Sequence, residues 1–500
     1  MRPGLRAWPS FLAPVFCAGL LAACAVVPLK PAPLMECRAL YTQADQKARE
    51  TGAADPGLYR IPGFPYLRAS RFLASFRDEV SDPARFQAWV TLLRAADATA
   101  RDREIRAANG RMDWDPQLTA LRDRLDRCGD ELAQADLADP QARARLSDAV
   151  EVPSEYSWAQ RLFGAYPLAV PFLNRGIAKY HDAVLAEFKK PLEPPAAGRM
   201  ELWLPEADAA EPPATPEQVA AWIARSASQP LGIPAFSDAE LRRMFAAYAP
   251  AWWVETAGDD DRPGSPAFDK AGKPTLDIGK PRTYVLQDYT RVNGEVLPQL
   301  VYIVWFSARP REARFDAYSG ALDGLVWRVT LSADGHPLVY DTIHPCGCYH
   351  EYFPARALKR RDAGSFWNES ALLPQDDPVG EGRVAVRIAS GTHFVQRVLP
   401  LSQLEAGAGK SASRTYRFAP YLHLTMLPNA AGSPRDLFDP DTGIVAGTER
   451  LERWWLWVSG VKDPGAMRAW GRHAIQFVGE GHFDDPHILD QVFDFSGDTP

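Results

Sequence analysis

The 500-residue sequence lacks the short motifs that identify several large enzyme classes. It contains no P-loop, no GxGxxG after a predicted strand, no HExxH and no GxSxG. These absences weaken assignment as a kinase, a dehydrogenase, a zincin-type protease or an α/β-hydrolase, because each of those chemistries uses its motif to place phosphate, dinucleotide, zinc or nucleophile. They leave open an active site of another design.

The chain also lacks an excess of positive charge. Lys and Arg number 56 against 63 Asp and Glu, which gives a formal net charge of −7. A mildly acidic protein offers no general attraction for nucleic acid, so no nucleic-acid partner is expected. Apolar residues at 46% and charged residues at 24% are ordinary for a globular protein, and the length predicts two or three domains.

Long apolar runs are absent beyond the N-terminus, where one short run stands in a specific context. Arg2 and Arg6 precede an apolar stretch over residues 11–20, and Leu21-Ala22-Ala23-Cys24 closes it with small residues before a cysteine. The stretch is shorter than the roughly 20 apolar residues that a membrane-spanning helix needs. The pattern resembles the lipobox of bacterial lipoproteins.

The lipobox resemblance implies a signal peptide at residues 1–23 and fatty acids such as palmitate on Cys24. Several acyl chains anchor a protein stably, because each buried methylene contributes about 0.8 kcal/mol. Ala25 rather than Asp follows the cysteine, which in lipoproteins indicates the outer membrane, with the protein facing the periplasm. The expected partner is therefore the membrane, through the anchor and a Pro-rich tether over 24–34. An envelope protein or cell-wall component is a further partner to consider.

Cysteine is scarce, and the four that remain after residue 24 fall into two groups. Cys37 and Cys128 both lie in helix-like sequence. Because an oxidising compartment favours disulfides, the two are expected to join a pair of helices. Cys346 and Cys348 then belong to each other or to something that they bind together.

The hydrophobic period changes along the chain and predicts an α+β fold. Apolar residues recur at three- and four-residue spacing in the N-terminal half, whereas alternation and turn signals at Asn293-Gly294 and Asp334-Gly335 indicate antiparallel hairpins after residue 250. The expected organisation is a helical N-terminal half and an antiparallel β-rich C-terminal half that ends in helices. Its segments are a helical domain over 35–200, a connector with helices over 201–250, and a β-rich domain over 251–500 with helices at 463–479 and 483–493.

The stretch HPCGCYH is the richest cluster of potential metal ligands. His344, Cys346, Cys348 and His350 occupy alternate positions. On a straight strand such neighbours stand about 6.6 Å apart, too far to surround one zinc ion at about 2.0–2.3 Å. Pro345 and Gly347, which lie between them, favour a bend that could bring two or three ligands onto one ion.

A further ligand would have to come from elsewhere in the chain. His393 is the preferred candidate, and His423 and His473 are the alternatives. Thiolate and imidazole suit zinc, or copper as Cu(I), so these are the expected cofactors if metal binds. In an enzymatic version, an open coordination position would activate water with Glu351 or Asp341 as general base.

Two other interpretations of HPCGCYH need only the cysteines. A disulfide between Cys346 and Cys348 would close a small ring, depart from relaxed geometry and be easily reduced, which is a property of redox sites. Alternatively, both cysteines are structural. The functional hypothesis is therefore a membrane-anchored envelope lipoprotein with a metal or thiol-redox site, and its alternative is a non-catalytic structural or partner-binding lipoprotein.

Overall fold

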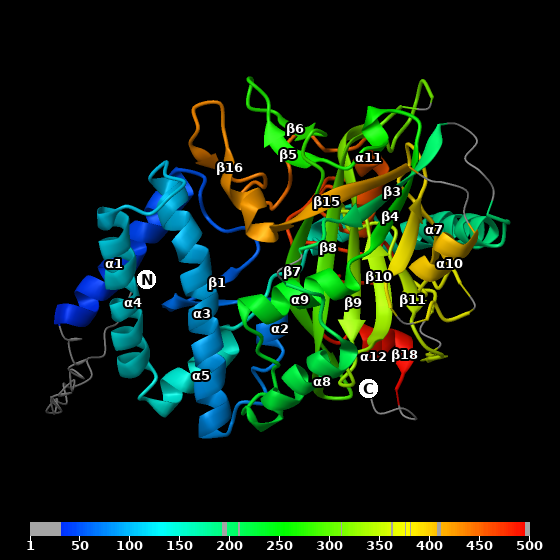
Figure 1. Cartoon of the computed structure of the whole chain (residues 1–500). Coiled ribbons are helices and arrows are strands. Elements are labelled where there is room, and N and C mark those ends of the chain that lie inside the picture. Colours follow the sequence, from blue (N-terminus) through cyan, green and yellow to red (C-terminus); the bar gives the residue numbers. More distant parts are fainter. Residues whose placement is uncertain are drawn as a thin grey trace, which may run out of the picture.

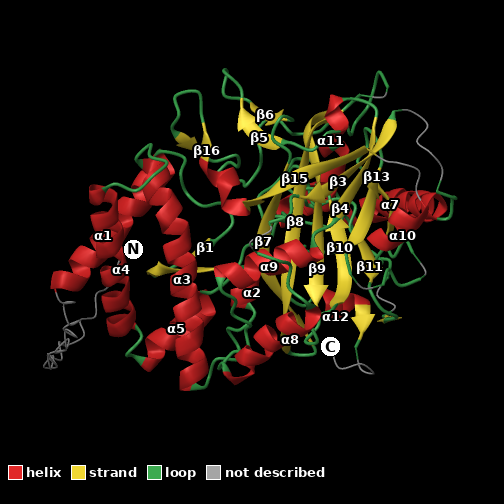
Figure 2. Ribbon diagram, viewed as in Figure 1, coloured by secondary structure: helices red, strands yellow, loops and turns green. Residues whose placement is uncertain are grey.

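The computed structural model describes residues 32–192, 198–208, 211–311, 313–361, 364–375, 377–380, 382–407 and 412–495. The expected signal peptide, the lipidation site Cys24 and most of the tether lie outside these ranges. Helices and a large mixed, nearly barrel-shaped sheet both contribute, so the chain is α+β (Figure 1, Figure 2). No helix among the described residues is both long enough and apolar enough to cross a membrane.

The first part of the structure is a group of helices around a short hairpin. Three of the helices begin with the same pair, Asp followed by Pro, and in each the Asp side chain accepts backbone N–H groups of the first turn. This pair fixes where those helices start. The elements are α1 (Ala32–Glu50), β1 (Tyr59–Ile61), β2 (Phe64–Ala69), α2 (Arg71–Ala74), α3 (Pro83–Ala108), α4 (Pro116–Asp136) and α5 (Pro140–Ala149).

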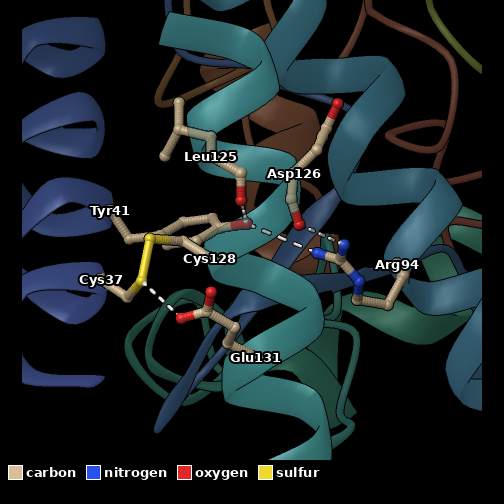
Figure 3. Close-up of a disulfide and its surroundings, with 7 residues drawn as sticks. All are labelled: Cys37, Tyr41, Arg94, Leu125, Asp126, Cys128 and Glu131. Carbon is tan, nitrogen blue, oxygen red and sulfur yellow. Dashed lines mark hydrogen bonds between the residues drawn. A yellow bond between two sulfur atoms is a disulfide. The ribbon is translucent and has the colours of Figure 1, made fainter. Parts of the chain in front are cut away.

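A disulfide joins α1 to α4, as expected from the sequence. Cys37 and Cys128 are bonded and buried in the core of this part (Figure 3). One turn along α1, the Tyr41 hydroxyl donates a hydrogen bond to the Leu125 carbonyl of α4 at 3.0 Å. The covalent and polar contacts together fix the register of the two helices.

A buried ion cluster connects the hairpin to α3. Arg68 on β2 has no exposed side-chain surface, and it donates to both carboxylate oxygens of Glu104 at 2.9 and 2.7 Å and to Asp97 at 2.9 Å. Because a buried guanidinium is costly unless it is paired, these acids are required partners.

The second part is a ten-stranded sheet in the order β11-β10-β9-β8-β7-β15-β3-β4-β13-β14. Its strands are β3 (Arg199–Pro205), β4 (Ala251–Thr256), β7 (Arg282–Val292), β8 (Glu295–Arg309), β9 (Gly320–Leu331), β10 (Pro337–Ile343), β11 (Glu351–Pro354), β13 (Val384–Ile388), β14 (Val395–Pro400) and β15 (Ala412–Pro420). Four two-strand ribbons complete the strands, including β1–β2 and those formed by β5 (Ser265–Phe268), β6 (Pro274–Asp277), β12 (Lys359–Arg360), β16 (Leu427–Pro428), β17 (Pro434–Arg435) and β18 (Phe493–Asp494).

The sheet is mixed, which corrects the purely antiparallel expectation. The hairpins at Asn293-Gly294 and Asp334-Gly335 are present as β7–β8 and β9–β10. However, β15 pairs in parallel with β3 and β7, and β13 pairs in parallel with β4. The parallel pairs arise because segments distant in sequence enter the sheet between the hairpins, an arrangement that local turn signals do not encode.

Both faces of the central strand β8 are buried, which explains its nearly continuous apolar sequence. On one face, Tyr302 and Val304 share a core with α7 (Tyr166–Phe188), α8 (Pro216–Ala224) and α9 (Asp238–Tyr248). On the other face, Ile303 and Trp305 pack with Cys346 and Phe483. The HPCGCYH stretch therefore lies on the second of these two cores.

The expected helix over 463–479 is wrong, and that segment is irregular. Gly465, Gly471 and Gly479 adopt φ of +85°, +85° and +91°, a region that a right-handed helix does not visit. The expected helix over 483–493 is reduced to α12 (Ile488–Val492). Other short helices are α6 (Trp158–Phe163), η1 (Arg225–Ser228), η2 (Asp259–Asp261), α10 (Leu401–Gly407), η3 (Tyr421–Met426), α11 (Arg453–Leu456) and η4 (Trp457–Ser459).

Candidate functional site

HPCGCYH forms a tight loop between β10 and β11. The Gly347 N–H donates to the His344 carbonyl at 2.8 Å, and the His344 N–H donates to the Cys348 carbonyl at 3.0 Å. The bend expected at Pro345 and Gly347 is thus present, and residues 344–348 form a closed turn instead of a straight strand.

The irregular segment that follows η4 packs against this loop and donates hydrogen bonds to it. The Arg468 N–H donates to the Pro345 carbonyl at 2.9 Å, and its buried guanidinium donates to the Cys346 carbonyl at 3.2 Å. Gly347 has φ of +93°, and a Cβ there would lie 2.3 Å from the Ala474 carbonyl oxygen. Only glycine fits this contact without a backbone shift.

The turn places the two thiols side by side. Cys346 is 5% exposed and Cys348 is partly exposed, and both are free thiols. The Cys348 N–H lies 3.5 Å from the Cys346 sulfur. A hydrogen bond between the side chains lowers the pKa of Cys346, while the same bond and burial raise the pKa of Cys348. The shared hydrogen bond therefore favours a thiolate on Cys346, with the proton held by Cys348.

A buried carboxylate, Asp323 on β9, organises two of the histidines. Its oxygens lie 3.2 Å from Nδ1 of His344 and 3.0 Å from Nδ1 of His393. Burial opposes its ionisation, but the two histidines outweigh burial and hold the pKa of Asp323 well below its usual value. Asp323 is thus a buried anion shared by two imidazoles.

The surroundings shift the pKa values of the two imidazoles in opposite directions. Burial lowers the pKa of His344. Burial acts in the same direction on His393, but the carboxylates of Asp323 and Asp261, which accept from its ring, outweigh burial and raise the pKa of His393. The arrangement favours the charged form of His393, which lies between two carboxylates, and the neutral form of His344.

The contact between His393 and Asp323 depends on curvature of the sheet. His393 follows β13, and Asp323 lies on β9, six strand positions away in the sheet. In a flat sheet six positions span about 29 Å, at about 4.8 Å each. The observed 3.0 Å contact therefore requires the sheet to curl back on itself.

His350 is positioned by a separate acid. Its Nε2 lies 2.9 Å from Asp341, whose carboxylate also accepts hydrogen bonds from the buried guanidinium of Arg328. Burial opposes ionisation of Asp341, but Arg328 and His350 lower its pKa, so the carboxylate accepts and Nε2 donates. Burial lowers the pKa of His350, which leaves a neutral ring with Nδ1 as its basic nitrogen.

Left-handed backbone conformations concentrate at this site. Among the described residues, six positions other than glycine have positive φ, and three of them are Leu322, Tyr349 and His393. Leu322 directly precedes Asp323, and Tyr349 lies within HPCGCYH. His393 is the second histidine that contacts Asp323. Such conformations cost about 1–3 kcal/mol each and persist where the surroundings impose them, which is common at functional sites.

A cavity of about 850 Å³ adjoins the loop. Cys348, Tyr349 and His350 form part of its wall, and α7 contributes an apolar wall that includes Leu173 and Ile177. The volume is in the range of small-molecule sites, and the mixture of apolar walls with a few polar groups is typical of them.

Two carboxyl groups in the cavity wall, the buried Glu452 and the partly exposed Glu369, give the cavity acid–base capacity near neutral pH. Burial raises the pKa of Glu452 to about 7, against opposing effects of Arg450 and Arg309. Burial likewise raises the pKa of Glu369 to about 7, although two backbone N–H groups donate to it. Groups of this kind can donate or accept a proton at physiological pH.

The structure brings the predicted ligands together only in part. His344 and His393 share Asp323, the two cysteines are adjacent, and His350 is paired with Asp341. Within the described ranges, no group of three or more His, Cys, Asp or Glu side chains is arranged to hold a metal ion. The zinc or copper site therefore stays a prediction.

The alternative ligands have other environments. His473 is buried and hydrogen bonds to the Pro345 backbone, and burial lowers its pKa to about 4. His423 lies exposed on η3. The proposed general bases also have defined partners, since Asp341 binds Arg328 and Glu351 accepts a hydrogen bond from Tyr180 at 2.9 Å.

Sequence reasoning missed Asp323, Asp261 and Arg468. Asp323 is an acid inside the otherwise apolar strand GALDGLVWRVTL, and a lone acid in such a strand could have indicated a buried partner. Asp261 lies in an acidic, Gly/Pro-flanked stretch whose sequence suggests a solvated loop, yet it is buried. Arg468 gives no local signal, because its role depends on a loop far away in sequence.

Glu351 provides a test of the electrostatics beside the site. Burial raises its pKa to about 8, so the folded state retains a proton that the unfolded state releases near pH 4.5. Its stabilising contribution is therefore complete below that unfolded value and declines as pH rises through about 8. When the pH rises from about 5 to about 8.5, the free energy of unfolding should fall by a few kcal/mol less in Glu351→Gln than in the wild type.

Urea denaturation at both pH values measures the effect of Glu351→Gln. The control is Glu295→Gln, which changes an exposed glutamate at the β7–β8 turn and should follow the wild type. Identical pH dependence in all three proteins would show that Glu351 is ionised in the folded state.

Comparison of the chain with models of protein families, with curated proteins and with solved structures finds no match to any of them.

Proposed function

We propose that this chain is a lipid-anchored envelope protein with a thiol-redox site in the wall of a ligand pocket. In this account the helical N-terminal half is a scaffold and the antiparallel hairpins of the C-terminal half carry the site. One observation carries the proposal: Cys348 lies in the wall of the 850 Å³ cavity while its neighbour in the turn, Cys346, is buried behind it. An accessible thiol backed by a second thiol is the arrangement that dithiol exchange requires.

The histidine contacts favour thiol chemistry over a four-ligand metal site. His350 donates to Asp341, and the Nδ1 atoms of His344 and His393 both face Asp323. These contacts support the loop and set its electrostatics. The two sulfurs are thereby left as the reactive atoms of HPCGCYH.

The reaction that fits this geometry is exchange with a disulfide RSSR that enters the pocket. Cys348 passes its proton to the Cys346 thiolate and then attacks one sulfur of RSSR, which breaks the S–S bond and expels RS⁻. Cys346, after losing its proton, then attacks the Cys348 sulfur of the mixed disulfide and expels the second RS⁻. Two protons convert the products to two RSH, and two electrons pass from the protein to RSSR. In reverse, the oxidised pair accepts two electrons from thiols.

A metal site is the second candidate, and one observation favours it. Nε2 of His344 is buried without a hydrogen-bond partner, while Nδ1 faces Asp323. Metal-bound histidines are commonly held this way by a carboxylate. Elemental analysis of protein purified without chelator separates the two candidates, because about one equivalent of zinc or copper lost in Cys346→Ser would support metal.

The location follows from the lipobox resemblance and belongs to the same proposal. An acylated Cys24 would attach the chain to the outer membrane, facing the periplasm, where disulfides form and exchange. A structural or partner-binding role, with an envelope protein or cell-wall component as partner, is the alternative if the thiols prove inert.

A small aromatic disulfide that releases a coloured thiol tests the exchange reaction in the purified full chain. The wild type should release about two equivalents of thiol and form the Cys346–Cys348 disulfide. Cys346→Ser should release about one equivalent and retain a mixed disulfide on Cys348. Cys348→Ser should react slowly, because Cys346 is buried.

Circular dichroism provides the folding control for both variants, since the Cys37–Cys128 disulfide and the helical part are distant from the change. Equal reaction of Cys348→Ser and wild type, or an unreactive wild type with both thiols free, would remove the basis for the redox site.

A further inference from the structure

Exposed apolar side chains gather on the surface formed by α6, α7 and α11. Phe163 is 82% exposed and Leu168 is 75% exposed. Both α6 and α7 pack against η4, which directly follows α11, so these short elements form one surface. We call this the apolar patch, and it comprises Trp158, Leu162, Phe163, Leu168, Phe172 and Trp454.

A stripe of exposed side chains runs along one side of α7, and it is apolar in its first half and basic in its second half. Leu168, Phe172, Arg175 and Lys179 are all exposed and follow at spacings of four, three and four residues, which places them on one side of the helix. The first half of the stripe is apolar and the second half is basic. Exposed apolar side chains with Lys and Arg beside them are a combination that membrane-interface segments use.

The charge around the patch contrasts with that of the whole chain. Residues 156–181 contain Arg161, Arg175 and Lys179 and no Asp or Glu, with Glu155 and Asp182 directly outside that range, whereas the chain has a net charge of −7. Arg161 is paired with Glu480 at 2.8 Å, so Arg175 and Lys179 are the cations that the exposed stripe of α7 presents. Basic side chains next to exposed Trp, Phe and Leu are complementary to an anionic bilayer, where the apolar groups enter the interface and the cations contact headgroups.

The cavity opens beside this patch. Phe172 and Trp455 are exposed residues that also line the cavity, and the less exposed Leu173 and Ile177 of α7 continue its wall. An apolar molecule that leaves a bilayer at the patch would therefore reach the cavity without crossing water.

We propose that the apolar patch is a membrane-docking surface for anionic lipid, through which an apolar ligand enters the pocket. The evidence for this surface comes from the residues of the apolar patch and does not depend on the thiol site. The proposed anchor would add a separate contact, because α7 lies at the opposite end of the molecule from α1 in Figure 1. Residues 24–31 extend to about 28 Å at most, so anchor and patch together would orient the protein along the membrane.

Vesicle co-sedimentation tests the docking surface with the polypeptide from residue 25 onward. This polypeptide keeps every described contact and lacks the lipid that would mask the patch. We expect binding to vesicles of phosphatidylglycerol and phosphatidylcholine, and weaker binding to phosphatidylcholine alone. Leu162→Ser with Leu168→Ser should weaken binding about tenfold or more, because two exposed leucines leave the interface.

Two further variants separate the contributions. Leu192→Ser with Leu422→Ser removes two exposed leucines outside the patch, and it should bind as the wild type does. Arg175→Ala with Lys179→Ala should weaken binding about tenfold and reduce its salt dependence.

Three outcomes would overturn the docking proposal. The first is equal vesicle binding by the two double leucine variants, and the second is equal binding of the wild type to neutral and anionic vesicles. The third is self-association through the patch without vesicle binding, which sedimentation velocity detects. Each is independent of the thiol chemistry, because no cysteine at 346 or 348 is changed.

Discussion

Replacing Asp323 by alanine is expected to lower the free energy of unfolding by about 3–5 kcal/mol, the cost of leaving a buried charge without its partner. The substitution removes the shared acceptor of His344 and His393 and leaves His393 with Asp261 as its one remaining carboxylate. Arg450, 3.7 Å from Asp323, loses a counter-charge as well. Urea denaturation at about pH 7 measures the change.

The sign of the pH dependence provides a second check on Asp323. Because its pKa in the folded protein lies well below the usual value, its contribution is present above the unfolded pKa of about 3.9 and is lost as the pH falls through the folded value. The difference between wild type and Asp323→Ala should therefore shrink in acid. The control Asp259→Ala removes an exposed carboxylate of the same short segment as Asp261, and should change stability by less than about 1 kcal/mol. Equal effects of both substitutions would contradict the buried-anion account.

Replacing Gly347 by alanine is expected to displace the loop and separate the two thiols. The new Cβ would combine φ of +93° with a 2.3 Å approach to the Ala474 carbonyl oxygen. We expect a loss of about 2–4 kcal/mol, the sum of the conformational cost and overpacking, and the loss of thiol exchange. Thermal unfolding and the aromatic disulfide assay measure the two effects.

The matched control for Gly347→Ala is Gly294→Ala in the β7–β8 turn. Gly294 has a similar φ of +85°, but a Cβ there would have nothing within 4 Å. This control keeps the conformational cost and removes the clash, so its loss should be about 1 kcal/mol, with exchange unchanged. Equal losses for both variants, with exchange retained in Gly347→Ala, would show that close packing at the loop is unimportant.

Local signals in the sequence predicted local structure well. Asn293-Gly294 and Asp334-Gly335 identify two hairpins because their residues accept positive φ, and Cys37 and Cys128 form the expected disulfide between helices. Pro345 and Gly347 correctly indicate a bend. A few adjacent residues determine the two turns and the bend, whereas the disulfide between residues 91 positions apart was expected from the cysteine count and the helical pattern around each cysteine.

Features that depend on distant segments escaped prediction. The parallel entry of β15 and β13 into the sheet, and the curl that brings His393 to Asp323, join residues far apart in sequence. The segment 463–479 has apolar spacing typical of a helix, but its glycines adopt positive φ because the segment packs behind the HPCGCYH loop. Tertiary contacts thus overrode a helical pattern there.

Equilibration of the full chain in glutathione buffers, followed by alkylation and mass analysis, tests the central claim most directly. We expect Cys346 and Cys348 to convert reversibly between dithiol and disulfide, with a midpoint above about −300 mV, the range below which structural disulfides lie. Cys37–Cys128 provides the internal reference and should remain oxidised throughout. A pair that stays fully alkylated in every buffer, or that resists reduction as Cys37–Cys128 does, would contradict a redox site in the pocket wall.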